Sequence, residues 1–421
     1  FLSENEDFAQ AVLDAGMIWV GPSPEAIRLM GVKTEARTLM AQANVPLVPG
    51  FASDTASDQE FIIAAEQIGF PVMVKAAGGG GGKGIRVVYQ ADELLEALSG
   101  ARREAQKAFG DARVFLERYI ETGRHIEVQV LADQHGNTIH LYERECSAQR
   151  RHQKIIEETP SPLLNDQQRQ AIGIAAVKAA QAVNYVNAGT VEFIATKQGE
   201  FYFLEMNTRL QVEHPITELV TGVDIVKLQF QIASGEPLPF TQADVDQRGH
   251  AIECRIYAEN PRNHFLPATG MIHTFIPPSG PGIRVDTYLK SGDEISIHYD
   301  PMIAKLIVYD RTREAAITRM RHALETTVVL GVTTNLEFLQ TLLTHPIFTE
   351  GKINTAFIDS HLEELMPDQS PINDLALIAA ALNDSVSTMI PTGKAVTSSQ
   401  STGSDAYSPW ARSDTFRLHR K

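Results

Sequence analysis

The chain has 421 residues, enough for roughly two to four domains that each bury an apolar core. Hydrophobic residues make up 43% of it and charged residues 21%, and no apolar run approaches the roughly 18 residues of a membrane span, so no membrane role is expected. The formal net charge of −15 argues against a nucleic-acid-binding surface, and two cysteines, Cys146 and Cys254, cannot form a disulfide framework, which suits a reducing compartment.

The first part of the chain, residues 6–46, alternates short helical patterns with one apolar stretch. Residues 17–20 predict a strand, and the Gly-Pro-Ser-Pro sequence that follows predicts a turn from strand to helix. This pattern is typical of the last part of an open α/β sheet. Because the chain starts at Phe1, without an initiator Met or a targeting pattern, we expect a fragment.

A second, smaller unit is predicted from about residue 49 to residue 119. Its small size and a glycine run at 78–82 predict a mobile lid. The predicted elements are a helix at 58–68, strands at 72–75 and 85–88, a helix at 91–108 and a strand at 114–117.

Strand patterns predominate from residue 124 to residue 310, which predicts an α+β core on a large, mainly antiparallel sheet. The clearest strands are at 125–130, 138–143, 190–194, 201–206 and 251–257, with helices near 166–183 and 223–234. Helical patterns resume after residue 311. Residues 384–405 are rich in Ser, Thr and Gly and predict a linker.

The glycine run, continued by Lys83 and Gly84, lies between two predicted strands, where bare backbone N–H groups could wrap a polyphosphate. A Walker A loop is excluded because Ala77 and Gly84 stand where it needs Gly and Ser or Thr. A dinucleotide-binding loop is disfavoured because a strand, not a helix, follows. A flexible surface hairpin is the alternative. The nearby Lys75 and Lys83 favour the phosphate-binding interpretation.

Residues 205–215 are the most informative stretch. If they stay extended, side chains of one parity project from one face and form a polar wall. These side chains belong to Glu205, Asn207, Arg209, Gln211 and Glu213.

Two carboxylates in apolar strands, Glu192 and Glu205, are expected to leave water. A buried carboxylate without a partner is costly, whereas a hard divalent cation would compensate both of them together with the Asn207 amide oxygen. Magnesium that bridges ATP phosphates is the natural occupant. The alternative is that the carboxylates pair with arginines such as Arg209.

Two further groups of basic residues stand out. Residues 149–154 hold two Arg, a His and a Lys, which predicts an anion site, with a solvated loop as the alternative. Arg255 lies on a half-apolar strand, where an ion pair with Glu253 or Glu259 is equally compatible. The cysteines and isolated histidines such as His250 and His298 are interpreted as core or surface residues.

Three stretches resemble the signatures of biotin carboxylases, an ATP-grasp family. They are residues 71–84, residues 150–158 and residues 205–215, and the likeness extends over residues 1–360. The resemblance implies an α/β and α+β ATP-grasp fold. Its divisions would be the C-terminal part of the N-terminal domain at 1–47, the lid at 48–119, the ATP-grasp core at 120–249, the biotin carboxylase C-terminal domain at 250–360, and a linker with the start of a further domain at 361–421.

The resemblance also implies residue roles. ATP would be held by Lys33, Lys75, Gly81, Gly82, Glu117, Arg118, Ile120, His125, Gln149 and His152. Mg²⁺ or Mn²⁺ would be held by Glu192, Glu205 and Asn207. Bicarbonate would be held by Lys154, Arg209, Gln211 and the Val212 backbone, with Glu213 as its base and Arg255 in contact with both bicarbonate and biotin.

The reaction implied is the formation of carboxyphosphate from ATP and bicarbonate, its breakdown to CO₂ and phosphate, and carboxylation of biotin. No Met-Lys-Met sequence occurs, so biotin is expected on a carrier domain outside this chain. Residues 408–418 resemble the start of the middle domain in α subunits of acyl-CoA carboxylases, particularly those acting on 3-methylcrotonyl-CoA. The expected partners are therefore the carrier domain and a carboxyltransferase β subunit, in an oligomer of the bacterial cytoplasm or the mitochondrial matrix.

Alternative functions remain open from sequence. Another ATP-grasp ligase, such as a carbamoyl-phosphate synthase, would share the lid and the metal carboxylates, but Arg209, Gln211, Glu213 and Arg255 disfavour it. A propionyl-, acetyl- or geranyl-CoA carboxylase is an alternative holoenzyme. A non-catalytic scaffold is disfavoured because the catalytic side chains are all present.

Overall fold

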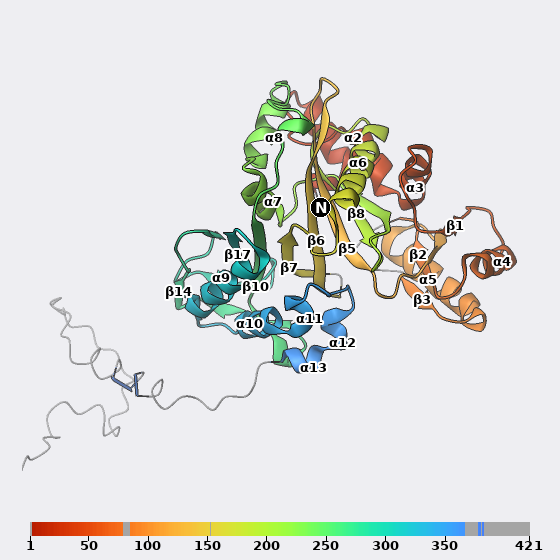
Figure 1. Ribbon diagram of the computed structural model, residues 1–421. Helices are drawn as coiled ribbons and strands as arrows, with labels where there is room; N and C mark the ends of the chain where they lie inside the picture. Colours follow the sequence, from red (N-terminus) through yellow and green to blue (C-terminus); the bar gives the residue numbers. More distant parts are fainter. Residues whose placement is uncertain (1, 79–84, 152, 367–377, 380, 383–421) are drawn as a thin grey trace, which may run out of the picture. The chain divides into compact units, whose positions relative to one another are not determined.

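The computed structural model describes residues 2–78, 85–151, 153–366, 378–379 and 381–382 (Figure 1). The predictions for Gly81, Gly82, His152 and the linker at 384–405 lie outside these residues. The chain divides into two compact units, Phe1–Pro367 and Asp368–Lys421. All helices and strands named below belong to the first unit.

Three helices form the N-terminal part: α1 Glu6–Asp14, α2 Pro24–Gly31 and α3 Lys33–Gln42. The side chain of Ser23 caps α2 and Pro24 occupies its first turn, as the turn sequence predicted. The strand predicted at 17–20 is wrong. These residues pair with no strand among the described residues, and Met17 and Ile18 are 58% and 70% exposed, because an extended segment needs a neighbouring ladder to form a strand.

A small antiparallel sheet follows, with the strand order β1-β4-β2-β3. Its strands are β1 Gly50–Ala52, β2 Val72–Ala76, β3 Arg86–Val88 and β4 Val114–Arg118, and its helices are α4 Asp58–Ile68 and α5 Leu94–Phe109. Both helices share one apolar cluster with the strands. A capping box at Ser57 starts α4, and left-handed Gly110 ends α5. The elements predicted for this unit are confirmed.

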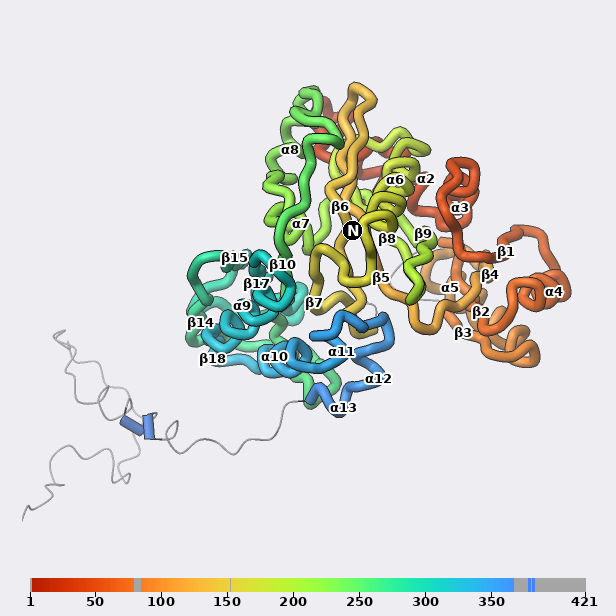
Figure 2. The backbone as a smooth tube through the Cα atoms, in the orientation of Figure 1, coloured from red at the N-terminus to blue at the C-terminus, as the bar shows by residue number. Residues whose placement is uncertain are grey.

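The central sheet has eight strands in the order β15-β17-β10-β7-β6-β5-β8-β9, and all its neighbouring pairs are antiparallel. The strands are β5 Arg124–Ala132, β6 Thr138–Arg150, β7 Gln153–Thr159, β8 Asn187–Ala195, β9 Phe201–Asn207, β10 His250–Tyr257, β15 Ile283–Asp286 and β17 Met302–Asp310. The β5–β6 hairpin, gold in Figure 2, extends to the top of the view. The predicted antiparallel core is confirmed.

The two faces of β5 differ in chemistry. Ile126, Val128 and Val130 belong to the apolar cluster that includes helix α6 Asp166–Ala182. Because side chains alternate along a strand, His125, Glu127 and Gln129 lie on the opposite face. Helix α7 His214–Thr221 contacts the neighbouring strands β6, β7, β10 and β17, and α8 Ile225–Ala233 contacts β8.

The C-terminal part packs its first two helices against β10, and the first of them also contacts β17. The helices are α9 Arg313–Thr326, α10 Leu336–Thr344, α11 Pro346–Thr349, α12 Phe357–Ser360 and α13 Leu362–Leu365, and short strands complete it: β11 Glu259–Asn260, β12 Leu266–Pro267, β13 Gly270–Met271, β14 Thr274–Ile276, β16 Glu294–Ile295 and β18 Val328–Leu330. Ile252, Cys254 and Ile256 of β10 join the apolar cluster that contains α9. The other parity of β10 therefore faces α7.

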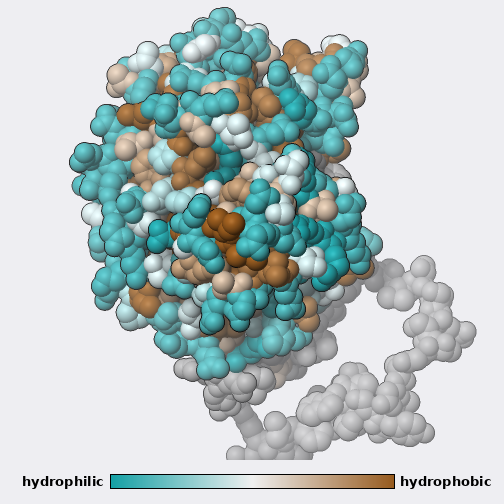
Figure 3. Space-filling view, turned by 90° about the vertical axis from the view of Figure 1, so that its right-hand side faces the viewer, coloured by the Kyte–Doolittle hydropathy of each residue, from teal (hydrophilic) through white to brown (hydrophobic). Residues whose placement is uncertain are grey.

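The surface shown in Figure 3 sets several groups of hydrophobic side chains among hydrophilic ones. Among the described residues, none of the helices is both long and apolar enough to cross a membrane.

Candidate active site

Four charged side chains form a row across the central sheet. Glu205 on β9 lies opposite Glu192 on β8, Glu192 lies opposite Glu127 on β5, and Glu127 lies opposite Arg144 on β6. Like charges directly opposite each other destabilise an antiparallel pair. The row therefore needs cations between its carboxylates.

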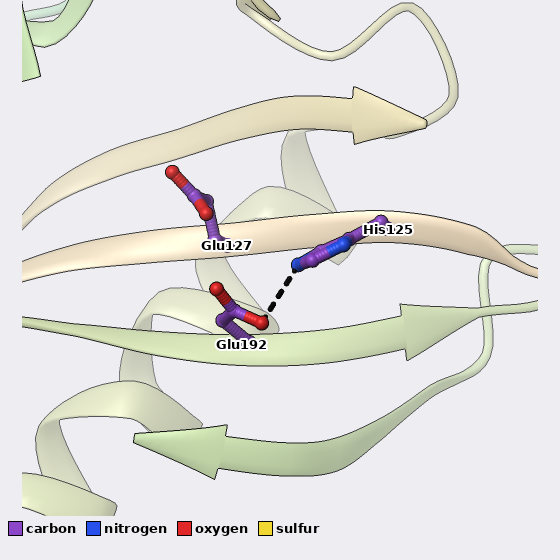
Figure 4. A group of neighbouring side chains, drawn as sticks. All are labelled: His125, Glu127 and Glu192. Carbon is purple, nitrogen blue, oxygen red and sulfur yellow. Dashed lines mark ion pairs between the residues drawn. The ribbon is translucent and has the colours of Figure 1, made fainter. Parts of the chain in front are cut away.

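Glu192 is the most heavily contacted carboxylate of the row. Its Oε1 accepts hydrogen bonds from Asn207 Nδ2 at 2.8 Å, Gln211 Nε2 at 3.1 Å and Lys154 Nζ at 3.1 Å. Its Oε2 lies 3.0 Å from His125 Nε2, an ion-pair contact rather than an aligned hydrogen bond (Figure 4). Burial opposes ionisation, but Lys154 and His125 hold the pKa of Glu192 well below its ordinary value.

Lys154 is the cation that separates these carboxylates. Its ammonium contacts Glu127, lies 3.1 Å from Glu192 and lies 2.5 Å from Glu213 Oε1. Although burial favours the neutral amine, the three carboxylates raise the pKa of Lys154 well above its ordinary value. The side chain therefore stays positively charged inside the site.

Glu213 lies between two cations. Lys154 holds its Oε1, and Arg255 Nη2 donates to its Oε2 at 3.0 Å. Burial opposes ionisation, but Lys154, Arg255 and Arg144 hold the pKa of Glu213 far below its ordinary value. Glu213 is therefore a carboxylate at neutral pH.

Arg255 does not pair with Glu253 or Glu259, the partners considered from sequence. Its Nε donates to Glu157 Oε1 at 2.6 Å and its Nη2 to Glu213. The side chain is only 11% exposed. The alternative of an ion pair with Glu253 or Glu259 is therefore not what forms, and one of the actual partners of Arg255 is the candidate base.

The predicted polar wall at 205–213 is wrong in its geometry. Strand β9 ends at Asn207, and the chain then turns into α7, so the single parity is lost. Gln211 and Glu213 still reach the site through the turn. Arg209 points elsewhere: its Nε donates to Glu4 Oε2 at 3.0 Å and its Nη2 to Asn207 Oδ1 at 3.3 Å.

The two predicted metal carboxylates differ in burial. The Glu192 side chain is 9% exposed and the Glu205 side chain 39%, so the prediction that both are buried away from water is wrong for Glu205. Neither pairs with Arg209 within the described residues. Glu205 instead accepts from Lys33 Nζ at 2.9 Å.

The predicted ATP residues fall into separate positions. Lys75 and Arg37 both pair with buried Glu117, and Gln149 Nε2 lies 3.3 Å from His125 Nδ1. Arg118 is exposed and Ile120 is half-buried. The Val212 carbonyl accepts from Lys305 Nζ at 2.9 Å.

The basic stretch at 150–154 is not one anion site among its described residues. Arg150 stacks on the Phe265 ring, 4.0 Å from its centre, and lies 3.6 Å from Glu259. Arg151 is exposed, with a φ of 48°. Only Lys154 enters the carboxylate row.

Three residues of the site had no role predicted from sequence: Glu127, Arg144 and Glu157, the last of which lies in the signature stretch at 150–158. Glu127 carried a readable signal, since His125, Glu127 and Gln129 alternate with apolar residues on one strand. His125, Glu127 and Glu192 also offer ligand atoms that lie within 4.8 Å of one another, a spacing that suits a metal ion (Figure 4).

Three family models match successive parts of the chain. The biotin carboxylase N-terminal domain matches residues 1–27, the ATP-binding domain of the carbamoyl-phosphate synthase L chain matches residues 32–241, and the biotin carboxylase C-terminal domain matches residues 253–360. Biotin carboxylase of Nostoc sp. is 50% identical over 358 residues, which cover 85% of this chain and 80% of the relative. The mitochondrial α subunit of methylcrotonoyl-CoA carboxylase of Dictyostelium discoideum is 46% identical over 420 residues, 100% of this chain but 59% of the relative.

Solved structures agree with these matches. The biotin carboxylase domain of Hydrogenobacter thermophilus 2-oxoglutarate carboxylase, a dimer in complex with MgADP, ADP and bicarbonate, has a TM-score of 0.84 and 46% identity, and the match covers 88% of this chain and 82% of that one. A Campylobacter jejuni biotin carboxylase complex with a βγ-ATP ligand has a TM-score of 0.83 and 42% identity, with coverage of 86% and 80%.

Proposed function

Because this chain belongs to the biotin carboxylase family of ATP-grasp enzymes, we propose that it uses ATP to carboxylate biotin with bicarbonate. The observation that carries the proposal is the position of Glu213 between Lys154 and Arg255. The two cations attract an anionic substrate to a carboxylate that can accept its proton once they turn to that substrate.

The ATP site would lie between the small sheet and the central sheet. Lys33, Lys75 and His125 would contact the nucleotide, together with Gln149, Glu117 and the remaining residues that the resemblance implies. Ion pairs with Glu205 and Glu117 place the ammonium groups of Lys33 and Lys75 at this position. ATP phosphates would take over contacts that these carboxylates now make.

A divalent cation fits the donor set of Glu192, Glu205 and Asn207. These side chains lie on the adjacent strands β8 and β9 and offer hard oxygen atoms, the ligands that Mg²⁺ and Mn²⁺ prefer. The ion would supply positive charge that draws electron density from the γ-phosphate. In the structure, Lys33 pairs with Glu205 and Lys154 pairs with Glu192. A bound cation would neutralise these carboxylates instead, so both ammonium groups would be free to bind phosphate or bicarbonate.

Bicarbonate would bind beside Glu213. Lys154, Arg255 and Gln211 surround this position, and their donors could pass from the protein carboxylates to the substrate. When Lys154 and Arg255 turn to bicarbonate, Glu213 loses the charges that hold its pKa low and becomes a stronger base. Deprotonated bicarbonate would then attack the γ-phosphate to give carboxyphosphate and ADP.

Arg255 would act again in the second step. Carboxyphosphate breaks down to CO₂ and phosphate, phosphate takes the biotin N1 proton, and the guanidinium stabilises the negative ureido oxygen. Loss of such an oxyanion donor typically costs about 10² to 10³ in rate. Arg209, which lies 3.0 Å from Glu4, would help to hold bicarbonate only after leaving that partner.

The whole protein's role goes further than this chain. The chain spans about 59% of the length of methylcrotonoyl-CoA carboxylase α relatives, and its tail supports 3-methylcrotonyl-CoA as the acyl substrate of the holoenzyme. Biotin would arrive on a carrier domain, and a carboxyltransferase β subunit would complete the oligomer. The compartment would be the bacterial cytoplasm or the mitochondrial matrix, and the domain divisions at 47, 119, 249 and 360 belong to the same proposal.

The test is ATP cleavage by the intact protein with and without bicarbonate and free biotin. We expect cleavage to require bicarbonate and to rise with biotin, and a Glu213→Gln variant to lose at least about 10²-fold, the usual contribution of a general base. Exposed Glu325 provides the matched control, and Glu325→Gln should behave as the wild type. Cleavage that ignores both bicarbonate and biotin would instead indicate another ATP-grasp ligase.

A further inference from the structure

Two glutamates lie opposite each other in the central sheet, next to Arg255. Glu157 on β7 and Glu253 on β10 are register partners of the antiparallel pair, and both are fully buried. Directly opposed residues place their Cβ atoms about 4.5–5.5 Å apart on the same face, so the two carboxyl groups can touch. Two ionised carboxylates would repel each other here.

The hydrogen bonds of this pair are incomplete within the part of the chain that the structure describes. Glu157 Oε1 accepts from Arg255 Nε at 2.6 Å, but its Oε2 has no donor. Both oxygens of Glu253 lack a donor as well. Buried polar groups are almost always paired, so three orphaned oxygens on two opposed carboxyl groups indicate a missing proton donor. A proton on one carboxyl would supply it.

Among the residues that the structure places, none donates a hydrogen bond to the carboxyl group of Glu253. Its side of β10 also bears Ala251, which clusters with Ile216, Val220 and Ile307. The charged groups that face it are Glu157 from β7, Arg255 from its own strand, Lys305 from β17 and Glu213 from the start of α7. Lys305 bonds neither oxygen of Glu253, and its Nζ lies 2.9 Å from the Val212 carbonyl and 3.3 Å from Asp286 instead.

Protonation of Glu253 agrees with its electrostatic environment. Burial and the charge of Glu157 raise the pKa of Glu253 well above its ordinary value. Burial also raises the pKa of Glu157, to about 7, although Arg255 favours its charged form. Glu253 is the weaker acid of the pair and keeps the proton, because Arg255 hydrogen-bonds Glu157 and not Glu253.

We propose that Glu253 is a neutral carboxylic acid that donates a hydrogen bond to Glu157, and that this pair positions the guanidinium of Arg255. The inference rests on the proposed function, since Arg255 is the group that acts on bicarbonate and biotin. Glu157 and Glu253 touch no substrate and are positioning residues. The shared proton leaves one negative charge on the pair, which holds Arg255 Nε while Arg255 Nη2 reaches Glu213.

The pair should affect turnover more than nucleotide binding. With an apolar side chain at 253, Glu157 Oε2 would be left without a donor, and the Glu157 carboxylate could turn away from Arg255 to find one. Arg255 would then shift toward Glu213 and lower its basicity. The nucleotide contacts of Lys33 and Lys75 lie on other elements and would be unchanged.

The experiment compares Glu253→Gln, whose amide can still donate to Glu157, with Glu253→Met, which has similar length and cannot donate. In biotin-dependent ATP cleavage by the intact protein, Glu253→Gln should stay within about threefold of the wild-type kcat, and Glu253→Met should lose roughly tenfold or more, with the KM for ATP unchanged in both. Infrared difference spectra at neutral pH should show a protonated-carboxyl C=O band in the wild type that both variants lack.

Three results would overturn the inference. They are a wild-type spectrum without that band, a Glu253→Met variant as active as Glu253→Gln, or a loss confined to the KM for ATP. The infrared comparison with Glu253→Gln decides the case even where Glu253→Met does not fold. A failure of the proposed function is distinguishable, because the wild type itself would then cleave ATP without need of bicarbonate.

Discussion

At the scale of single residues, the site is a set of charges that neutralise one another before substrate arrives. Lys154 touches three carboxylates, and Arg255 touches two. Buried ion pairs of this kind contribute little net stability, because desolvation offsets their attraction. We propose that these cations exchange partners: a carboxylate whose cation turned to phosphate or bicarbonate would become more basic.

Arg144 is the residue whose substitution we expect to disturb this exchange of partners most. It is fully buried, and its guanidinium donates to Glu127 Oε1 at 2.5 Å and to Gln211 Oε1 at 3.2 Å. Three more bonds go to Gln129, Thr217 and Thr190. An Arg144→Lys variant keeps the charge but loses the planar fork, so Gln211 and Glu127 would be released. We expect the KM for bicarbonate to rise at least about tenfold, and the free energy of unfolding to fall by about 3–5 kcal/mol.

Arg169→Lys is the matched control for Arg144→Lys. Arg169 on α6 pairs with buried Glu143 at 2.8 Å, away from the carboxylate row. This variant should lose stability, as measured by urea unfolding, while its KM for bicarbonate stays at the wild-type value. Equal KM values in the two variants would show that Arg144 is only structural.

At the scale of elements, periodicity predicted most of the fold because each element has a local signal. Alternating residues of β5 and the capped helix α4 are examples, and the ATP-grasp fold is confirmed by the solved structures. The strand predicted at residues 17–20 is wrong because a strand requires a pairing partner, which the local sequence does not encode. The polar wall predicted over residues 205–213 is wrong beyond Asn207, because the turn into α7 ends the alternation of side chains.

The site was predictable in its residue types but not in its pairings. Glu192, Lys154 and Glu213 stood out by charge in apolar or signature stretches. Their joint contact depends on the register between β5, β6, β7 and β8, which brings together residues far apart in sequence. Arg144 and Glu157 acquire significance only from that register, so a single sequence could not identify their partners.

One contact between elements should make folding stability depend on acid pH. Glu158 on β7 accepts from Arg313 Nε on α9 at 2.7 Å and lies 2.8 Å from His250 Nε2 on β10. Burial opposes ionisation, but His250 and Arg313 lower the pKa of Glu158 to about 2 from its ordinary 4.5. Since the folded pKa is the lower one, the stabilisation is present above pH 4.5 and is lost as pH falls toward 2. The shift corresponds to about 3 kcal/mol.

Urea unfolding of Glu158→Gln and of the wild type between pH 6 and roughly pH 2.5 measures this contribution. The variant should be less stable at pH 6, and the difference should shrink by up to about 3 kcal/mol on acidification. Exposed Glu363 is the control, and Glu363→Gln should follow the wild-type pH curve. A constant difference between Glu158→Gln and wild type at all pH values would refute the assignment.

At the scale of the first unit, helix α3 and the loop after it make main-chain bonds to both sheets. Phe203 N donates to the Pro46 carbonyl at 2.8 Å, and Lys33 N donates to the Ala77 carbonyl at 3.1 Å. Lys33 also pairs with Glu205 on β9 and Arg37 with Glu117 on β4, beside the apolar packing of α2 and α3 on the central sheet. We expect nucleotide and metal to engage Lys33, Glu117 and Glu205, so binding should act on the unit as a whole.

Thermal unfolding with MgATP tests this coupling. A ligand at about 100 times its Kd stabilises the folded state by about 2.7 kcal/mol, which corresponds to an increase in Tm of a few degrees. Glu192 supplies a carboxylate oxygen to the proposed metal site. In Glu192→Gln, the increase in Tm that depends on Mg²⁺ should therefore be mostly lost. Glu200 is exposed, and Glu200→Gln is the matched control. Comparing shifts, not absolute Tm values, removes any intrinsic effect of the substitution on stability. If EDTA and Glu192→Gln both left the shift intact, Glu192 would not be a metal ligand, and its contacts with Lys154 and His125 would be the whole of its role.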